Sequence, residues 1–452
     1  MKTYKIYTIA LLLSSILLSC DNNLDVDPEQ SLTPEAALSS SDNILNLLVG
    51  AYDLAGQNEI FAGDYHLASE LLPNADELAW RGTYLGPAEF NRKVVTSGNS
   101  FVSDYWTYSY AVSNQVNLVL EGLEKFEDPD EAARVEGEAK FLRAAVYFDL
   151  ARFFSLPYNF NGANSQLGVP IVTAAVSDAS QIEYPSRNSV QEVYDFVVSD
   201  LNSAVTLLLE KNDIYADKYA AQALLARVYL QKGNYEGARD AANNVIENSG
   251  YSLTVDYPSA FNNENNSTED VFAWQITTQD GVNDMTIFWA IRFYGGRSLT
   301  GDITVEAPYF KNFSDKNDQR GQFFYEGNGT MLTTKWQDQF ANVPYIRLAE
   351  MYLIRAEANF RSGTTLGATP VEDVNILHKR SNASAVTSVI LDDIIAERKR
   401  ELAFEGFALH DAKRLQQTIA GLPYDSNALV LPIPQREIDA NENLEQNPGY
   451  NN

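Results

Sequence analysis

Cysteine, histidine and basic residues are scarce in this 452-residue chain, and each scarcity excludes a class of protein. A single cysteine cannot form an internal disulfide, so the chain is not a disulfide-stabilised scaffold. The 33 Lys and Arg residues are outnumbered by 61 Asp and Glu residues, which gives a net charge of −28. Binding to nucleic acid or to anionic lipid requires clustered basic residues, so this balance argues against both partners.

Recognisable catalytic and metal-binding motifs are absent from the sequence as well. The three histidines, His66, His378 and His410, form no zinc-binding motif. No nucleophile-elbow or phosphate-loop motif occurs. We therefore expect no metal site and no cofactor, and we predict that the protein is not an enzyme.

Two clusters of charged residues resemble functional sites but are better explained as structure. Asp315 to Glu326 spaces its acidic residues like a calcium loop, but Arg320 stands where that loop requires glycine. Glu397 and Glu401 lie one helical turn apart, and the three residues between them include two arginines and a lysine. Such neighbours favour ionised carboxylates in ion pairs over a catalytic acid with a raised pKa.

The N-terminus has the pattern of a bacterial lipoprotein signal. Two lysines precede an apolar stretch from Ile9 to Leu18, which is shorter than the roughly 20 residues that span a bilayer. A serine and the single cysteine, Cys20, follow at the position of a lipobox. We predict a signal peptide over residues 1–19, acylation of Cys20 and a polar tether over residues 20–31. An ordinary secretory signal with a chance cysteine is the alternative.

Helical periodicity dominates the rest of the chain. The predicted helices cover residues 42–57, 108–126, 130–154, 189–210, 218–231, 235–248, 343–361, 371–379 and 391–405. Two stretches, 71–103 and 248–342, lack this period, and residues 271–276 alternate as a β-strand does. Binding residues are often carried by loops on a rigid frame, so we expect the ligand site in these two stretches.

Residues 220–248 have the pattern of a helix hairpin. Small residues allow two helices to approach closely, and Gly233-Asn234 ends the first helix. The spacing is similar to that of a tetratricopeptide repeat, and looser versions occur at residues 144–148 and 349–353. The prediction is therefore a mainly α fold, an irregular array of tetratricopeptide-like helix hairpins with a loop-rich, minor-β ligand-binding region.

Several segments together resemble the RagB/SusD family, the outer-membrane nutrient-binding lipoproteins of Bacteroidetes. They are Glu138–Phe154, Ala220–Ala238, Pro344–Ala358 and Glu397–Gly406, the last followed by Leu431–Pro434 and Gln446–Tyr450. Their order and their spread over the chain carry the resemblance. One departure is Ala408, which stands where the family usually has arginine, although Asp411 and Arg414 of the same motif are kept.

The resemblance implies a lipoprotein on the outer face of the outer membrane that binds an oligosaccharide or polysaccharide. It also implies a partner, a SusC-like TonB-dependent transporter to which the ligand is delivered. A SusD-like N-terminal region would cover residues 32–255 and a RagB/SusD C-terminal region residues 256–452. We expect the tether and the Gln446–Tyr450 end to contribute to docking on the transporter, and surface loops are the alternative. A binder of peptides or other nutrients is the first alternative, and a glycoside hydrolase is the second.

Aromatic residues in the two loop stretches are the candidate ligand contacts. Sugar rings stack on Trp and Tyr, while polar side chains bind their hydroxyl groups. Trp80 and Trp289 each lie in a loop stretch with an arginine and a tyrosine close by, whereas the other three tryptophans fit core positions better. Loop packing is the alternative for these two. The predicted glycan-binding residues are Trp80, Arg81, Tyr84, Trp289, Arg292 and Tyr294.

Overall fold

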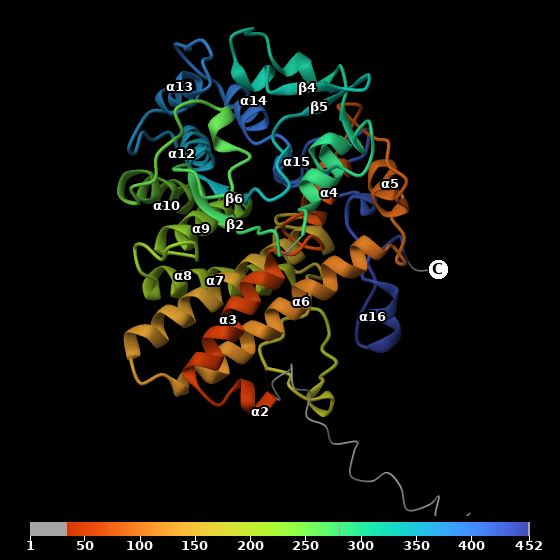
Figure 1. Ribbon diagram of the computed structural model, residues 1–452, viewed down its shortest axis with the longest axis vertical. Coiled ribbons are helices and arrows are strands. Elements are labelled where there is room, and N and C mark those ends of the chain that lie inside the picture. The colour runs from red at the N-terminus through yellow and green to blue at the C-terminus, as the bar shows by residue number, and fades with distance from the viewer. Residues whose placement is uncertain (1–33, 280, 451–452) are drawn as a thin grey trace, which may run out of the picture.

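The computed structural model describes residues 34–279 and 281–450, and this part of the chain is mainly helical, as predicted. The predicted signal peptide, Cys20 and the tether lie outside it. Long helices form the lower and left-hand parts of Figure 1, and short strands with long loops gather towards its top. No helix of the described residues has the length and apolar character needed to cross a membrane.

Consecutive helices pack against one another as an irregular array. The helices are α2 (Pro34–Ala37), α3 (Ser41–Ala55), α4 (Asp64–Leu71), α5 (Leu85–Arg92), α6 (Ser100–Glu121), α7 (Pro129–Phe154), α8 (Val190–Leu207), α9 (Lys218–Lys232), α10 (Tyr235–Asn248), α11 (Asp284–Trp289), α12 (Leu348–Ser362), α13 (Pro370–Arg380), α14 (Leu391–Glu401), α15 (Ala408–Arg414) and α16 (Gln435–Ala440). Helices α6 to α10 each contact the next in turn, and α10 then contacts α12, which packs on α13 and α14. The array therefore continues across the long loop stretch between α10 and α12.

The α9–α10 pair is the predicted hairpin. Helix α9 ends at Gly233, whose φ of +74° is the left-handed conformation that favours glycine. The side chain of Asn234 then caps α10 by accepting a hydrogen bond from the Gly237 N–H. Small buried residues, among them Ala223 and Ala238, line the contact between the helices. The predicted glycine break is therefore the turn of this hairpin, and the predicted small residues lie where its two helices meet.

The strands form three antiparallel pairs. They are β1 (Leu78–Trp80) with β3 (Ile303–Val305), β2 (Asp270–Trp274) with β6 (Val343–Arg347), and β4 (Phe324–Gly327) with β5 (Thr330–Thr333). The first pair joins the two loop stretches through residues that lie more than two hundred positions apart in the sequence. The second pair ties the start of the long loop stretch to the start of α12.

Three predicted helix boundaries are wrong. Residues 343–347 are strand β6, not the first turn of α12, because Pro344 disfavours the helical conformation for the residue before it and β6 pairs with β2. Helix α14 ends at Glu401, and Phe404 has a φ of +65°, which no helix accommodates. Helix α6 begins earlier than predicted, at Ser100, where the Asn99 side chain caps it. The stretch 71–103 also contains α5, which its sequence did not indicate.

One hydrophobic core runs through most of the described chain, from Ile44 to Leu444. The second half of α7, from Phe141 to Phe154, is buried on all sides, because helices and loops surround it. Three charged residues of this half, Arg143, Asp149 and Arg152, are buried as well and form ion pairs. Because this half of α7 has no solvent-facing side, its charged residues pair within the protein.

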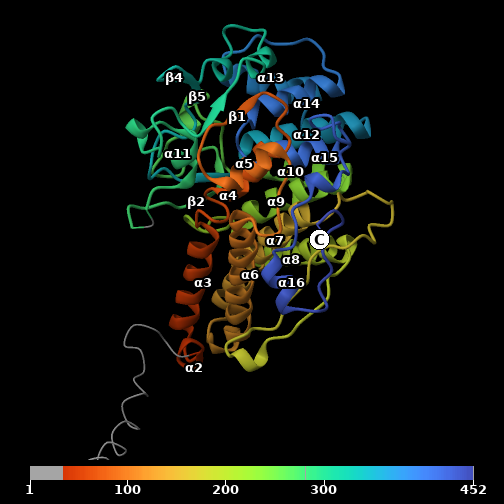
Figure 2. The ribbon, with the colours of Figure 1, turned by 90° about the vertical axis from the view of Figure 1, so that its right-hand side faces the viewer.

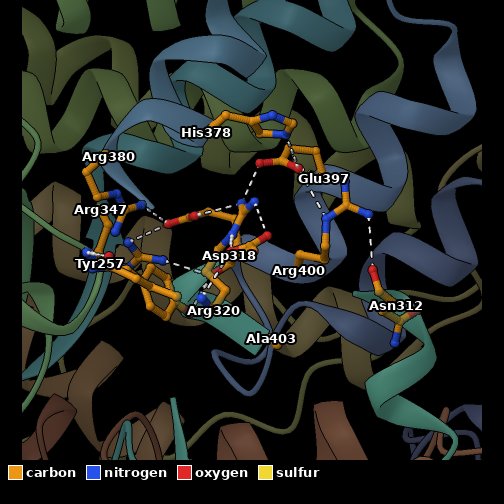
Figure 3. A network of polar contacts seen from close by, with 12 residues as sticks. Tyr257, Asn312, Asp318, Arg320, Arg347, His378, Arg380, Glu397, Arg400 and Ala403 are labelled. Atoms are coloured by element: carbon orange, nitrogen blue, oxygen red, sulfur yellow. Dashed lines mark hydrogen bonds and ion pairs between the residues drawn. The ribbon is translucent and has the colours of Figure 1, made fainter. Parts of the chain in front are cut away.

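A buried network of ion pairs joins the loop stretch to the last long helices (Figure 3). Arg347 at the end of β6 pairs with Glu401 (3.1 Å) and Glu405 (2.8 Å), and also with Glu269. Arg320 pairs with Glu397, Glu401 and Asp318. Each of these residues is at most 6% exposed. The interpretation of Glu397 and Glu401 as structural ion pairs is therefore confirmed.

The network keeps its carboxylates ionised. Burial alone would raise the pKa of Glu401, but the nearby Arg380, Arg347 and Arg320 lower it to about 2. A carboxylate with a lowered pKa contributes stability above its unfolded-state pKa, and this contribution disappears as the pH falls towards the folded-state value. For Glu401 the loss occurs between about pH 4.5 and pH 2.

The C-terminal end is bound to the body by Arg187. This buried guanidinium donates to the carbonyl oxygens of Phe154 (2.9 Å) and Glu445 (3.0 Å) and to the Asn447 side chain (2.9 Å). Asn447 in turn donates to the carbonyls of Phe154 and Leu431. Helix α16 lies alongside α6, where Arg436 bonds Thr107 (Figure 2). The polar side chains at this end thus serve internal contacts.

We expect Arg347→Met to lower the free energy of unfolding by about 3–5 kcal/mol, since it removes one positive charge that three buried carboxylates share and leaves them with fewer basic partners. Arg436→Met is the matched control, because that side chain is 54% exposed and its pair with Glu437 should contribute less than about 1 kcal/mol. Urea unfolding measures the free energy of unfolding of both variants. Equal losses would show that the buried network does not stabilise the fold.

Candidate ligand-binding site

The pairing of β1 with β3 brings together the two loop stretches that were expected to form the site. Trp80 lies opposite Ile303, and the Arg81 N–H donates to the Asp302 carbonyl oxygen (2.7 Å) just beyond the paired residues. Helix α11 packs on β3 from the same long stretch. The expected association of residues near 80 with residues near 289 is therefore present.

Arg81 is fixed by the opposite strand. Its Nε donates to the Thr304 hydroxyl and its Nη2 to the Glu306 carboxylate, both at 2.8 Å. The Arg81 side chain is still 47% exposed. The bond from the Thr304 hydroxyl, together with Arg81, lowers the pKa of Glu306, so this carboxylate is ionised at neutral pH. Arg81 is thus held in one place while part of its surface remains open to solvent.

Trp80 packs in close contact with the backbone that follows it. A Cβ at Gly82 would lie 2.4 Å from Cζ2 of the indole, so only glycine fits below the ring. The ring also lies near Phe288 of α11, with 5.9 Å between the ring centroids. Trp80 is half-buried and its Nε1 has no hydrogen-bond partner. The indole is therefore held between α11 and its own turn.

Tyr84 is the most exposed of the predicted tyrosines, at 46%. The guanidinium of Arg297 lies over its ring, 3.9 Å from the centroid. Arg297 is itself held by an ion pair with Asp302 and a hydrogen bond to the Thr83 hydroxyl. Phe288 lies 6.0 Å from the Tyr84 ring. These contacts hold an aromatic ring at the surface in a fixed orientation.

Arg292 and Tyr294 lie in the turn that follows α11, beside this cluster. Arg292 donates to the carbonyl oxygen of Arg297, the residue that stacks on Tyr84. Tyr294 packs against Tyr325 of β4, with 5.3 Å between the ring centroids. Phe293 between them is 83% exposed, an unusual position for a large apolar ring on a free surface. The turn thus extends the aromatic surface beyond Tyr84.

Trp289 lies below this surface. It is 1% exposed and packs on Phe404, with 5.2 Å between the ring centroids. In this conformation it offers no ring face to a ligand, and its position agrees with the alternative of loop packing. Trp106, Trp274 and Trp336 are also buried, as expected.

Two residues of this exposed cluster, Phe293 and Arg297, were not predicted from the sequence. Both lie within ten residues of Trp289, in the segment that the sequence singled out. The exposure of Phe293 and the stacking of Arg297 depend on the turn at residues 290–298, which has no regular period. We call Trp80, Arg81, Tyr84, Arg292, Phe293, Tyr294 and Arg297 the aromatic surface.

Metal ligands are not gathered here or in any other part of residues 34–279 and 281–450. No group of three or more His, Cys, Asp or Glu side chains is placed to hold an ion among them. The first carboxylate of the calcium-like loop, Asp315, is engaged within the protein. It accepts hydrogen bonds from the N–H groups of Asn317 and Ser384. The chemistry that this arrangement supports is stacking and hydrogen bonding.

Comparison with family models gives two matches along the chain. Residues 22–230 match a model described as starch-binding associating with outer membrane, and residues 209–429 match the model of the SusD family. The two matches together cover most of the chain.

Relatives of the chain agree with these models. The chain is 26% identical to the SusD-like protein P2 of Formosa agariphila over the whole of both chains. It is 24% identical to the starch-binding protein SusD of Bacteroides thetaiotaomicron over 99% of this chain and 98% of that one. The crystal structure of a putative sugar binding protein from Bacteroides vulgatus superposes with a TM-score of 0.80 at 26% identity, over 94% of this chain and all of that one.

We expect Gly82→Ala to destabilise the protein by about 1–3 kcal/mol, because the added methyl group forces the Trp80 indole out of its position. Gly98→Ala is the matched control, since a Cβ there meets no atom within 4 Å. That substitution should change stability by less than about 1 kcal/mol. Denaturant unfolding monitored by circular dichroism measures both, and similar losses in the two variants would contradict the packing described for Trp80.

Proposed function

Since this chain belongs to the SusD family, we propose that it binds an oligosaccharide or polysaccharide and delivers it to a SusC-like TonB-dependent transporter. The matching models describe starch binding in association with the outer membrane, and one relative is named as a starch-binding protein. The observation that carries the proposal for this chain is Tyr84, an exposed ring fixed by Arg297 beside Trp80.

The aromatic surface suits a carbohydrate because its rings and its donors are both fixed. A sugar ring stacks its C–H face on an aromatic ring, and its hydroxyl groups accept hydrogen bonds from guanidinium groups. Tyr84 and Phe293 supply exposed rings, and Arg81 and Arg292 supply exposed donors. Arg81 is already oriented by Thr304 and Glu306, so binding costs little further side-chain ordering.

Binding rather than catalysis is supported by the carboxylates near the surface. Glu306 is paired with Arg81, and Asp302 with Arg297. A glycoside hydrolase requires one carboxyl group as an acid and a second one as a nucleophile or base across a cleft. Both of these carboxylates are instead engaged in orienting arginines. A hydrolase remains the second alternative, and hydrolysis of a polysaccharide by the purified protein would establish it.

We further propose that acylated Cys20 and the tether hold the protein on the outer face of the outer membrane. The family description of outer-membrane association supports this location. In this proposal the tether and the surface loops dock on the transporter. The Gln446–Tyr450 end is a weaker candidate than the sequence suggested, because Asn447 and Gln446 bond the carbonyls of Phe154, Leu431 and Ile433.

Tyr84→Ala should weaken glycan binding at least tenfold and leave the melting temperature almost unchanged, because the ring is exposed and central to the surface. Tyr184→Ala is the matched control, since Tyr184 is 55% exposed in a distant loop. An array of plant, algal and host oligosaccharides beside peptide mixtures identifies the ligand, and titration calorimetry gives the dissociation constants. Peptide binding that is lost in Tyr84→Ala would favour the first alternative, a peptide binder with the same fold.

Trp80→Ala and Trp289→Ala should differ in their effects. Trp80→Ala should weaken glycan binding at least tenfold, whereas Trp289→Ala should lower the free energy of unfolding by about 3–5 kcal/mol, because its side chain fills a core position. Calorimetric titration and thermal unfolding of both variants separate these roles. Loss of affinity without loss of stability in Trp289→Ala would instead make Trp289 a ligand contact.

Cys20→Ala should release the protein from the membrane fraction, because it removes the proposed site of acylation. Protease treatment of intact cells should remove the unaltered protein from the surface. Purification in mild detergent should also recover a large outer-membrane barrel. Protection of the protein until the cells are broken would contradict the outer-face location.

A further inference from the structure

A cavity separate from the aromatic surface lies between α14, α15 and the segment 73–78. Its volume is about 530 Å³, which is within the range of small-molecule sites. Exposed residues such as Asp392, Lys399 and Thr418 border it, so it opens to solvent. None of the residues assigned to the aromatic surface lines it.

The floor of the cavity carries a carboxylate without a countercharge. Glu70, at the end of α4, is 5% exposed and lines the cavity. Its Oε1 accepts a hydrogen bond from the Gly406 N–H (2.9 Å). Among the described residues, no lysine, arginine or histidine forms an ion pair with it, although most buried carboxylates of this protein have such a partner. Lys335, which acts on Glu70 at longer range, is paired with Glu405.

The charge of Glu70 is poorly stabilised as a result. Burial raises its pKa to about 7, although the backbone N–H groups of Gly406, Ala408 and Phe407, which donate towards the carboxylate, act in the opposite direction. A buried ionised carboxylate is costly unless it is paired. A cation that entered the cavity would stabilise the ionised form and gain a strong, charge-assisted hydrogen bond.

The walls above Glu70 are apolar and aromatic. They include Leu78, Tyr309, Ile395, Phe404 and Phe407. Leu78, Tyr309, Phe404 and Phe407 are each less than 10% exposed, so these walls belong to the packed body of the protein and are largely preformed. Aromatic faces also attract cations. The cavity thus combines an apolar body with a single deep acidic group.

The basic groups of the cavity wall are already neutralised. Lys399 pairs with Glu77 at 2.6 Å, and Arg398 pairs with Asp411 at 2.7 Å. Glu70 and Asp392 remain without a basic partner among the described residues. The net charge of the lining is therefore negative, which disfavours an anionic ligand.

We propose that this cavity binds an organic cation with an apolar body, whose ammonium group pairs with the Glu70 carboxylate. The apolar part packs against Tyr309, Phe404 and Ile395. This site is separate from the aromatic surface and does not depend on the proposed function in glycan uptake.

Two probes of equal shape test the proposal: cyclohexylmethylamine, which is cationic at neutral pH, and cyclohexylmethanol, which is not. Titration calorimetry at pH 8 should show the amine binding at least tenfold more tightly than the alcohol. Glu70→Gln should remove that preference, because it keeps an acceptor for the Gly406 N–H but loses the charge. Glu89→Gln, which alters another buried carboxylate without an ion pair among the described residues but outside the cavity lining, is the matched control and should retain tight binding of the amine.

A second variant keeps the test independent of Glu70. Ala412→Phe places a large side chain in the cavity from the half-buried face of α15 and should block the amine while the melting temperature stays within a few degrees. Tyr84→Ala should leave binding of the amine unchanged, because Tyr84 lies outside the cavity. Equal affinity for amine and alcohol, binding of neither, or undiminished amine binding in Glu70→Gln would overturn the proposal.

Discussion

The buried ion pairs around Arg347 and Arg320 are the interaction on which the rest of this structure depends. Their partners come from separate segments: Glu269 precedes β2, while Glu401 and Glu405 lie at and beyond the end of α14. Removing so many charges from water costs free energy, and ion pairs offset this cost only when every charge has a partner. The network therefore permits one relative position of the long loop stretch and the last helices. The aromatic surface lies partly on the long loop stretch, and the cavity that Glu70 lines is bordered by α14. Both therefore depend on this relative position.

Much of the fold was predictable because its signals are local. Helix α9 ends at a glycine and α10 begins at an asparagine cap, and both choices follow from backbone chemistry within a few residues. The ion-pair role of Glu397 and Glu401 was predicted from the three basic residues between them. Of these three only Arg400 pairs with Glu397, and the main partners, Arg320, Arg347 and Arg380, come from other segments. Two of the boundaries that failed had local signals, Pro344 within β6 and the Asn99 cap of α6, but the apolar period was given more weight than these signals. Strand β6 also depends on a distant partner, because it pairs with β2.

The sequence singled out five of the seven residues of the aromatic surface, and Trp289 is the one predicted residue that lies below it. The two loop stretches meet because β1 pairs with β3, a contact that spans more than two hundred residues and leaves no mark on local periodicity. Trp80 and Trp289 have similar sequence surroundings, yet one is half-buried at the surface and the other lies in the core. Phe404, more than one hundred residues later in the chain, packs on Trp289. The segment around Trp289 carries no sign of that contact.

The attachment of the C-terminal end through Arg187 also bears on the order in which the molecule folds. The carbonyl of Phe154, at the end of the central helix, is bonded by Asn447, nearly three hundred residues later. Contacts of such long separation form late, because the ends of a large loop must first be brought together. The first half of the chain can form its helices during synthesis, but the centre of the molecule cannot be completed until Asn447 has been made. A nascent chain that stops short of Asn447 lacks the hydrogen bonds that this side chain makes with Arg187 and with the Phe154 carbonyl, so its centre differs from that of the folded protein before any ligand is met.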